Sequence, residues 1–364
     1  MSVRRVWAFF GTRQVSASRR GFLGPSTAVI DSAGPFLQNA SERGERSDLK
    51  LKKARRLKYG ETVGVISPAS PPWESTAVDE CVAGIQRLGF RPKLGRFARE
   101  SLGFLAGTDA QRAQDVNAMF GDPEVKAIVC VRGGYGTARI LDRLDYTLIR
   151  QNPKPLIGFS DITSLHCAML NQGGVIAFHG PNVHGALTRP GREFTVEAMR
   201  RAVMMPGPVG DICSDRADLR AAIVPIRGGK AEGPLVGGNL TVLNTMMGTR
   251  YQPTFENRIL FLEEVDEAPY RIDRALTFLL NLGVLQQVAG VVVGLCNGCV
   301  AKTERSSEQT LLDVLRDRLG GLGKPVIANA PFGHVASNAT LPVGVQATLD
   351  ADCGVLSIDE SGVV

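Results

Sequence analysis

A serine that directly follows a short apolar segment could act as a nucleophile. Residues Pro155 to Phe159 are predicted to form a strand, and an amphipathic helix is expected to begin directly after Ser160. Because no linker separates them, the chain must turn sharply at residues 158–161, which exposes the hydroxyl at a helix N-terminus. Helix capping by Ser160 is the alternative. The usual turn is Gly-x-Ser-x-Gly, and here Ile162 replaces the second glycine.

A nucleophilic serine needs a base and an acid, and the second half of the chain offers both. Glu263 ends an apolar run that is predicted as a strand, and His334 follows another such run. A histidine can accept the serine proton, and a carboxylate can orient the imidazole and stabilise its charged form. Glu264 and Glu267 are alternative acids, but Glu263 is preferred because it is the first residue past the apolar run. The other three histidines are interpreted as packed or capping residues (His166, His179 and His184).

A glycine-rich segment, Arg132-Gly133-Gly134-Tyr135-Gly136, follows an apolar run that is typical of a buried parallel strand. Its spacing matches neither the P-loop nor the dinucleotide-binding fingerprint. We therefore expect a loop whose backbone N–H groups face a ligand at the carboxyl end of the sheet. Such groups could form half of an oxyanion hole, with the N–H of Asp161 as the other half.

Composition and charge exclude several classes of protein. The chain has 364 residues, 44% of them hydrophobic, and no run approaches the roughly 20 apolar residues that span a bilayer. The net charge of +6 arises in residues 1–58, which hold 13 basic and 4 acidic residues, so only this segment suggests nucleic-acid binding. Seven scattered cysteines indicate free thiols in a reducing compartment, and hence a cytoplasmic location. Cys296 and Cys299 have no second pair, so no metal site is expected.

Alternating strand and helix patterns predict an α/β fold with a mostly parallel sheet, followed by a second, mixed α/β domain. We expect a disordered or mis-started basic extension at 1–57, an N-terminal domain at 58–205, a crossover at 206–236 and a C-terminal domain at 237–364. The serine lies in the first domain and the acid and base in the second, so the active site is expected between them.

From residue 59 onward the chain resembles the LD-carboxypeptidase family of serine peptidases. The resemblance is carried, in order, by Ile66-Ser67-Pro68-Ala69-Ser70, Arg132 to Gly136, Gly158-Phe159-Ser160-Asp161-Ile162-Thr163, His179-Gly180-Pro181, Gly237-Gly238-Asn239-Leu240, Leu262-Glu263-Glu264, Ala268-Pro269-Tyr270-Arg271-Ile272, Gly333-His334 and Leu341-Pro342-Val343-Gly344.

This resemblance implies that Ser160 is the nucleophile, Glu263 the acid and His334 the base, with the oxyanion hole formed by the Gly134 and Asp161 amides. It implies hydrolysis of terminal D-alanine from murein tetrapeptides through an acyl-enzyme, without metal or organic cofactor, by a homodimer. A carboxypeptidase must also hold a terminal carboxylate, and Arg132 beside the glycine loop is our candidate for that contact.

Two other readings compete with this one. The branch of the same family that gives immunity to microcin C cleaves a peptide-nucleotide toxin and would need an aromatic platform for the nucleobase. Between Val183 and Gly237 the only aromatic residue is Phe194, and the segment 231–239 resembles the murein-recycling branch more closely. A non-catalytic binding protein on this fold is the other reading, and the intact serine, glutamate and histidine argue against it.

Overall fold

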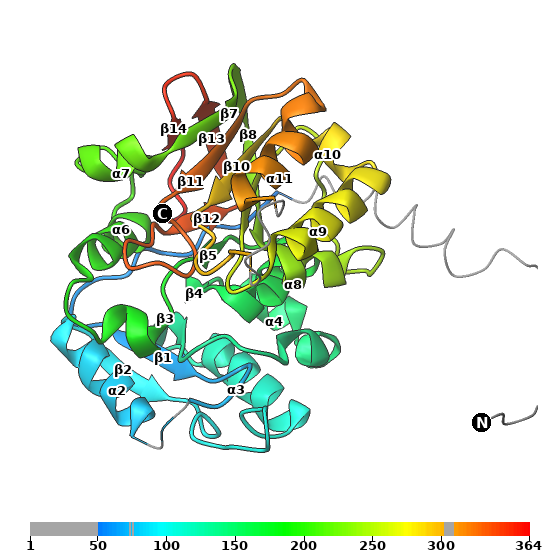
Figure 1. Ribbon diagram of the computed structural model, residues 1–364. Coiled ribbons are helices and arrows are strands. Elements are labelled where there is room, and N and C mark those ends of the chain that lie inside the picture. The colour runs from blue at the N-terminus through cyan, green and yellow to red at the C-terminus, as the bar shows by residue number, and fades with distance from the viewer. Residues whose placement is uncertain (1–49, 73, 75, 302–308) are drawn as a thin grey trace, which may run out of the picture. The chain divides into compact units, whose positions relative to one another are not determined.

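The computed structural model describes residues 50–72, 74, 76–301 and 309–364, and this part of the chain contains two β-sheets with helices packed on them (Figure 1). The first sheet has the strand order β12-β5-β4-β3-β1-β2, and all of these strands except β12 lie in the blue to green part of Figure 1. Its parallel strands are β1 (Thr62–Ile66), β2 (Arg91–Leu94), β3 (Val125–Cys130), β4 (Leu156–Gly158) and β5 (Ala177–His179). Strand β12 (Leu341–Val343) runs antiparallel to β5.

The inner strands of the first sheet are apolar because helices leave them little exposure to water. Every residue of β4 is buried, and so are all but one of the residues of β1 and of β3. The connecting helices are α2 (Ala77–Arg87), α3 (Asp109–Gly121), a 3-10 helix (Thr137–Arg143), α4 (Tyr146–Gln151) and α5 (Thr163–Ala168). Helix α3 begins with a capping box between Thr108 and Gln111.

The second sheet has the strand order β6-β14-β13-β8-β9-β10-β11-β7. Its central strands β8 (Lys230–Asn239), β9 (Ile259–Glu263), β10 (Gly290–Gly294) and β11 (Val326–Ala330) are parallel. The flanking strands are antiparallel: β6 (Gly210–Asp211), β7 (Val224–Arg227), β13 (Gln346–Asp350) and β14 (Val355–Ile358). The helices in this half of the chain are α6 (Glu193–Met204), α7 (Ala217–Ala222), α8 (Leu240–Met246), α9 (Pro269–Asn281), α10 (Val284–Gln287) and α11 (Leu311–Leu319). The α/β fold with a mostly parallel first sheet and a mixed second sheet confirms the predicted fold class.

The segment 206–236, predicted as a crossover, instead supplies β6, β7 and most of β8 to the second sheet. Strand β8 was not predicted from the sequence, because its glycines are unfavourable in a strand interior. The packing of the sheet nevertheless requires glycine here. A Cβ at Gly237, where φ is 149°, would lie 1.8 Å from the carbonyl oxygen of Phe261 on the neighbouring strand. Only a residue without a side chain allows β8 and β9 to approach this closely.

Two further expectations differ from the structure. The helix after Ser160 is not amphipathic, because every residue of α5 is buried beneath neighbouring helices and the second sheet. Part of the predicted extension also belongs to the fold: Ala54 pairs with Val363, and Ala54 and Leu57 are 2% and 3% exposed. Ala54 and Leu57 are therefore core residues, although most residues around them are basic. The remainder of the extension, residues 1–49, lies outside the described residues.

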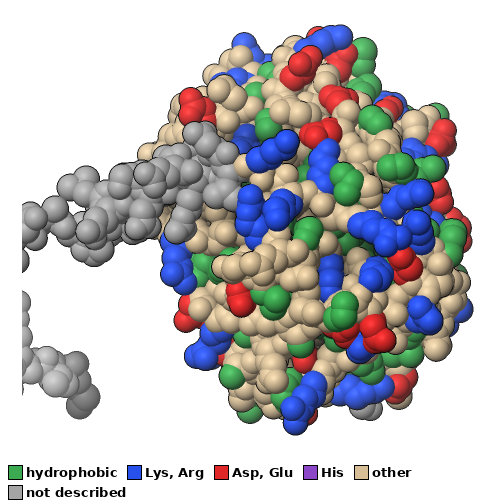
Figure 2. Space-filling model, turned by 180° about the vertical axis from the view of Figure 1, so that it is seen from behind, with side chains coloured by type: hydrophobic (Ala, Val, Ile, Leu, Met, Phe, Trp, Pro, Cys, Tyr) green, Lys and Arg blue, Asp and Glu red, His purple; other side chains and the backbone are tan. Residues whose placement is uncertain are grey.

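The surface carries mixed charge. Figure 2 shows one face, on which Lys and Arg side chains are interspersed with Asp and Glu. Within the part of the chain that the structure describes, every helix is too short or too polar to traverse a bilayer.

Candidate functional site

Ser160 lies at the sharp turn between β4 and the buried helices that follow. It begins a 3-10 helix (Ser160–Ile162) and adopts a left-handed backbone with φ of 67°, which is unfavourable for a non-glycine residue. The glycine loop packs directly on this turn, since a Cβ at Gly133 would lie 2.8 Å from the Cβ of Ser160. The N-cap residue of this 3-10 helix is Phe159 and that of α5 is Ile162, and neither helix has a side-chain cap. A strained turn that exposes a serine is the geometry of a nucleophile elbow.

The glutamate and histidine singled out in the sequence contact each other. Glu263, the last residue of β9, is 1% exposed, and its Oε2 lies 2.6 Å from Nδ1 of His334. The His334 ring in turn packs edge-on against Phe159, the residue before the serine, with 4.6 Å between ring centroids. The fold therefore brings the turn at Ser160, the imidazole and the carboxylate into one site, although they are far apart in the sequence.

The contact between Glu263 and His334 determines their protonation. Burial disfavours the charged form of each, which raises the pKa of Glu263 and lowers that of His334. Their hydrogen bond and mutual attraction outweigh burial, together with smaller contributions from His179 and Asn239 at the glutamate and from Glu264 and Asp266 at the histidine. The pKa of Glu263 is therefore below its usual value and the pKa of His334 is above its usual value of 6.5. This arrangement stabilises an imidazolium, the form that a general base reaches when it takes a proton.

The alternative acids make other contacts. Glu264 accepts hydrogen bonds from the Asn239 side chain at 2.9 Å and from the backbone N–H of Thr241 at 3.0 Å, so it fixes the start of α8. Glu267 forms an ion pair with Arg271 at 3.3 Å, one turn along the chain. Only Glu263 among these three carboxylates hydrogen-bonds to the imidazole within the described residues.

The glycine-rich loop lies directly beside the serine. A Cβ at Gly134 would lie 2.4 Å from Oγ of Ser70, so the loop backbone packs closely against residues 67–72. Asp161 joins this loop to the turn: its Oδ2 accepts hydrogen bonds from the backbone N–H of Thr137 at 2.8 Å and from its hydroxyl at 2.7 Å. This positioning role of the Asp161 side chain was not evident from the sequence, because nothing in the local pattern pairs it with Thr137.

Arg132 lies at the start of the same loop and is half-buried, which lowers its pKa. Its Nη1 donates a hydrogen bond to the carbonyl of Pro71 at 3.2 Å. This contact places the guanidinium against the loop of residues 67–72.

Two of the remaining histidines are packed in the interior, and the third, His184, is partly exposed and lines a cavity together with His334. His166 and His179 are fully buried, with ring centroids 6.2 Å apart, and burial lowers the pKa of each to about 3. His179 packs against the rings of Phe159, Phe261 and Phe332. Burial also lowers the pKa of His184. His166 and His179 are therefore neutral, and His334 alone is paired with a carboxylate among the described residues.

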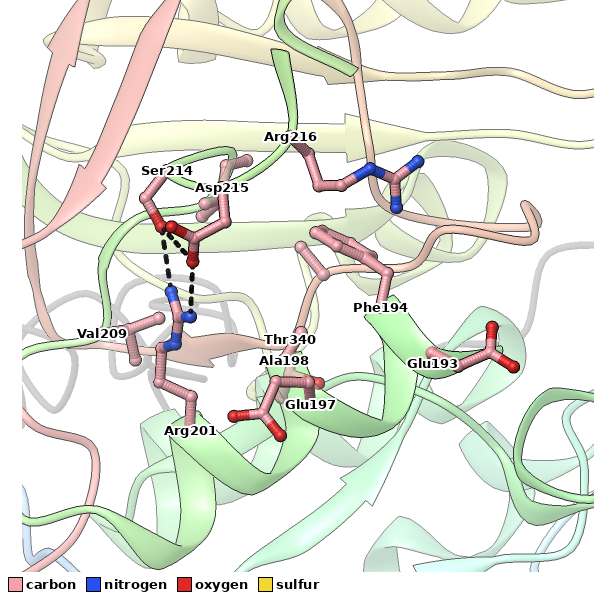
Figure 3. A pocket seen from close by; sticks show the side chains of 12 residues that line it. Glu193, Phe194, Glu197, Ala198, Arg201, Val209, Ser214, Asp215, Arg216 and Thr340 are labelled. Carbon is pink, nitrogen blue, oxygen red and sulfur yellow. Dashed lines mark hydrogen bonds and ion pairs between the residues drawn. The ribbon is translucent and has the colours of Figure 1, made fainter. Parts of the chain in front are cut away.

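Two cavities lie near α6, one lined by Arg192, which directly precedes the helix, and the other by residues of the helix itself. One, of about 460 Å³, opens at the candidate site and is lined by Phe159, His334 and residues 182–192 and 335–338 among others. The other, of about 310 Å³, is shown in Figure 3; Phe194, Glu197 and Arg201 point into it from α6, and Arg201 bonds to Ser214 and Asp215 on its far side. Only the first cavity is lined by a candidate catalytic residue.

The cysteines are free thiols, and Cys296 donates to the carbonyl of Gly294 at 3.5 Å. In the described ranges, no group of three or more His, Cys, Asp or Glu side chains could hold a metal ion.

Comparisons with known proteins agree with this geometry. A strained serine turn at the end of a parallel strand is the arrangement that α/β-hydrolases use to present a nucleophile. The model of the LD-carboxypeptidase N-terminal domain matches residues 63–180, and that of the C-terminal domain matches residues 232–349. The chain belongs to the LD-carboxypeptidase family, and it is accordingly a serine-type carboxypeptidase with LD-carboxypeptidase activity.

Similar proteins include one curated relative and two solved structures. The probable murein peptide carboxypeptidase of Bacillus subtilis is 36% identical over 298 residues, which are 82% of this chain and 91% of the relative. The muramoyltetrapeptide carboxypeptidase of Oxalobacter formigenes superposes with a TM-score of 0.71 at 27% identity and covers 82% of this chain and 98% of its own. The microcin C7 self-immunity protein MccF, in complex with aspartyl sulfamoyl adenosine, gives 0.76 at 26% identity, with 86% and 100% coverage.

Proposed function

We propose that this protein hydrolyses the bond between the diamino acid and the terminal D-alanine of murein tetrapeptides. The observation that carries the proposal is the hydrogen bond between Glu263 and His334 beside the strained turn at Ser160. The named substrates of the Bacillus and Oxalobacter relatives support the choice of a murein peptide.

In this mechanism, Ser160 Oγ attacks the carbonyl carbon and His334 takes the hydroxyl proton. The imidazolium then gives that proton to the amine of the departing D-alanine, which leaves an ester on the serine. Water hydrolyses the ester with His334 again acting as the base. Glu263 keeps the imidazole oriented and balances its charge throughout.

The oxyanion that forms at each step is assigned to the backbone N–H groups of Gly134 and Asp161. Support comes from the close packing of the glycine loop on Ser160 and from the hydrogen bonds that join Thr137 to Asp161. Arg132, at the start of this loop, is proposed to contact substrate. Cytoplasmic location and a homodimer complete the proposal, and are tested by cell fractionation and by light scattering of the purified protein.

The test is release of free D-alanine from purified murein tetrapeptide, followed by mass spectrometry, for the wild type and Ser160→Ala. Release by the wild type alone supports the proposal, because loss of the nucleophile is expected to cost about 10⁶-fold in kcat. Ser101→Ala, at an exposed position, serves as the matched control and keeps full activity. Equal release by wild type and Ser160→Ala contradicts the serine mechanism.

The second candidate is cleavage of an aminoacyl sulfamoyl nucleotide, which is favoured by the similarity to MccF in complex with aspartyl sulfamoyl adenosine. The chain offers a weak platform for a nucleobase: Phe194 lines the other cavity, where the guanidinium of Arg216 lies 5.5 Å from its ring centroid. We expect tetrapeptide to be hydrolysed faster than aspartyl sulfamoyl adenosine under the same conditions, and the reverse order supports the second candidate.

A further inference from the structure

The cavity beside His334 is built to attract an anion. Arg189 and Arg192 both line it, and none of its lining residues in the described chain is acidic. Arg192 precedes the first turn of α6, so the positive end of that helix dipole lies next to the same residue. The net charge of the residues that line this cavity is therefore positive even when His334 is neutral.

Two buried donor groups at this cavity have no acceptor. Nε and Nη1 of Arg192 are shielded from water and have no hydrogen-bond partner among the described residues. The same holds for Nδ2 of Asn338, whose residue is only 1% exposed. Its Oδ1, by contrast, accepts from the backbone N–H of Gly333 at 3.1 Å, which fixes the orientation of the amide. Unpaired buried donors are costly, and an incoming acceptor removes that cost.

The chemistry of the leaving group places a carboxylate in this cavity. To receive a proton from His334, the nitrogen of the scissile bond must lie within hydrogen-bond reach of the imidazole. The carboxyl carbon of a single terminal residue is only two bonds beyond that nitrogen, about 2.5 Å away. A carboxylate has the geometry to accept two hydrogen bonds from a guanidinium.

We propose that Arg192 and Asn338 form the subsite that binds the free carboxylate of the departing terminal residue, and so restrict the enzyme to cleavage at the end of a peptide. This proposal rests on the murein carboxypeptidase function above. It differs from the assignment of the carboxylate to Arg132, which lies across the turn in the glycine loop and already donates to Pro71.

The test compares two substrates that differ only at the terminal group: the tetrapeptide with a free D-alanine carboxylate and the same peptide with a D-alanine carboxamide. We expect the wild type to prefer the carboxylate substrate by roughly 10²-fold in kcat/KM, since an unpaired buried charge costs at least this much. Arg192→Gln should remove most of this preference by raising KM for the carboxylate substrate, with little change for the carboxamide.

Further variants separate binding from folding. Arg192→Lys keeps the charge and should recover part of the preference, whereas Asn338→Asp keeps the oxygen that accepts from Gly333 but repels a carboxylate. Arg201→Gln is the matched control, because Arg201 lies on the same helix but lines the other cavity (Figure 3). Its preference should equal that of the wild type. Thermal unfolding of each variant identifies any loss that comes from misfolding.

The outcomes are distinguishable. If wild type hydrolyses the carboxylate substrate and Arg192→Gln keeps the wild-type preference, this subsite is wrong while the proposed function stands. Equal losses on both substrates also overturn it, because the arginine then contacts another part of the peptide. Collapse of the preference in Arg132→Gln alone assigns the carboxylate to the glycine loop. A wild type that releases D-alanine from neither substrate overturns the proposed function and this subsite together.

Discussion

Replacing Glu263 by glutamine should change both the rate and the pH dependence of the reaction. The variant keeps the size of the side chain but removes the charge that faces His334. If the amide NH₂ donates to Nδ1, the imidazole must carry its proton on Nε2, where it cannot accept the proton of the serine. The same exchange of carboxylate for amide in a serine protease triad costs about 10⁴-fold in kcat, and we expect a similar loss here.

The pH dependence gives a second, independent readout. Activity requires neutral His334, so the rate rises with pH through the pKa of this residue, which in the wild type is above 6.5. The hydrogen bond to the charged carboxylate favours the imidazolium, so its loss lowers the pKa of His334. The residual activity of Glu263→Gln should therefore persist to lower pH than that of the wild type.

The assay is kcat/KM for D-alanine release between pH 5 and 9, with the His334 ring protons followed by NMR in both proteins. Glu267→Gln is the matched control, because that carboxylate pairs with Arg271 rather than with the imidazole. A wild-type profile without a limb above pH 6.5 would refute the reasoning. So would a limb in Glu263→Gln that stays in place or moves to higher pH, since the carboxylate would then not be the group that raises the pKa of His334.

Three further predictions concern the frame of the site. Gly237→Ala should lower the free energy of unfolding by roughly 3 kcal/mol or more, measured by denaturant titration, because its Cβ would overlap the carbonyl of Phe261; an unchanged midpoint contradicts the close approach of β8 and β9. Leu57→Ala should cost about 2 to 5 kcal/mol in the same titration if residues 50–57 are part of the core, and a neutral result would return them to the extension. Asp161→Ala should lower kcat for D-alanine release by about 10- to 10²-fold with little change in KM, because the glycine loop loses its hydrogen bonds through Thr137; a loss confined to KM would instead indicate a role in substrate binding.

Local patterns were sufficient to predict most elements of the fold. The apolar runs that form β3, β9 and β11 predicted buried parallel strands. The abrupt change from an apolar run to a helical pattern at Ser160 predicted the turn. These features depend on neighbouring residues in the chain, so the sequence displays them directly. Strand β8 was not predicted, because its glycines weaken the strand pattern. They are required instead by the close approach of the neighbouring strand β9.

Contacts between distant residues could not be predicted in the same way. The hydrogen bond of His334 to Glu263 spans 71 positions, and the ends of two predicted strands indicated the pair without showing that they meet. Nothing in the sequence indicated that Asp161 holds Thr137, or that Arg192 and Asn338 face one cavity, since each of these residues is unremarkable where it stands. Such pairings follow from the topology of the sheets, which places the ends of separate strands side by side.

The path of the chain after His334 constrains how substrate can enter. His334 lies in the segment that connects β11, in the second sheet, to β12, which pairs with β5 in the first sheet. This segment is therefore attached to both halves of the molecule. Thr195 at the start of α6 adds a further attachment, since its hydroxyl donates to the Ala336 carbonyl and accepts from the Asn338 N–H. A hinge that separated the two halves would have to break the ladder between β12 and β5. Sheet hydrogen bonds on both sides of its segment therefore fix the position of His334 relative to β4 and β5 in the first sheet, and we expect a peptide to enter by rearrangement of loops rather than by separation of the two sheets.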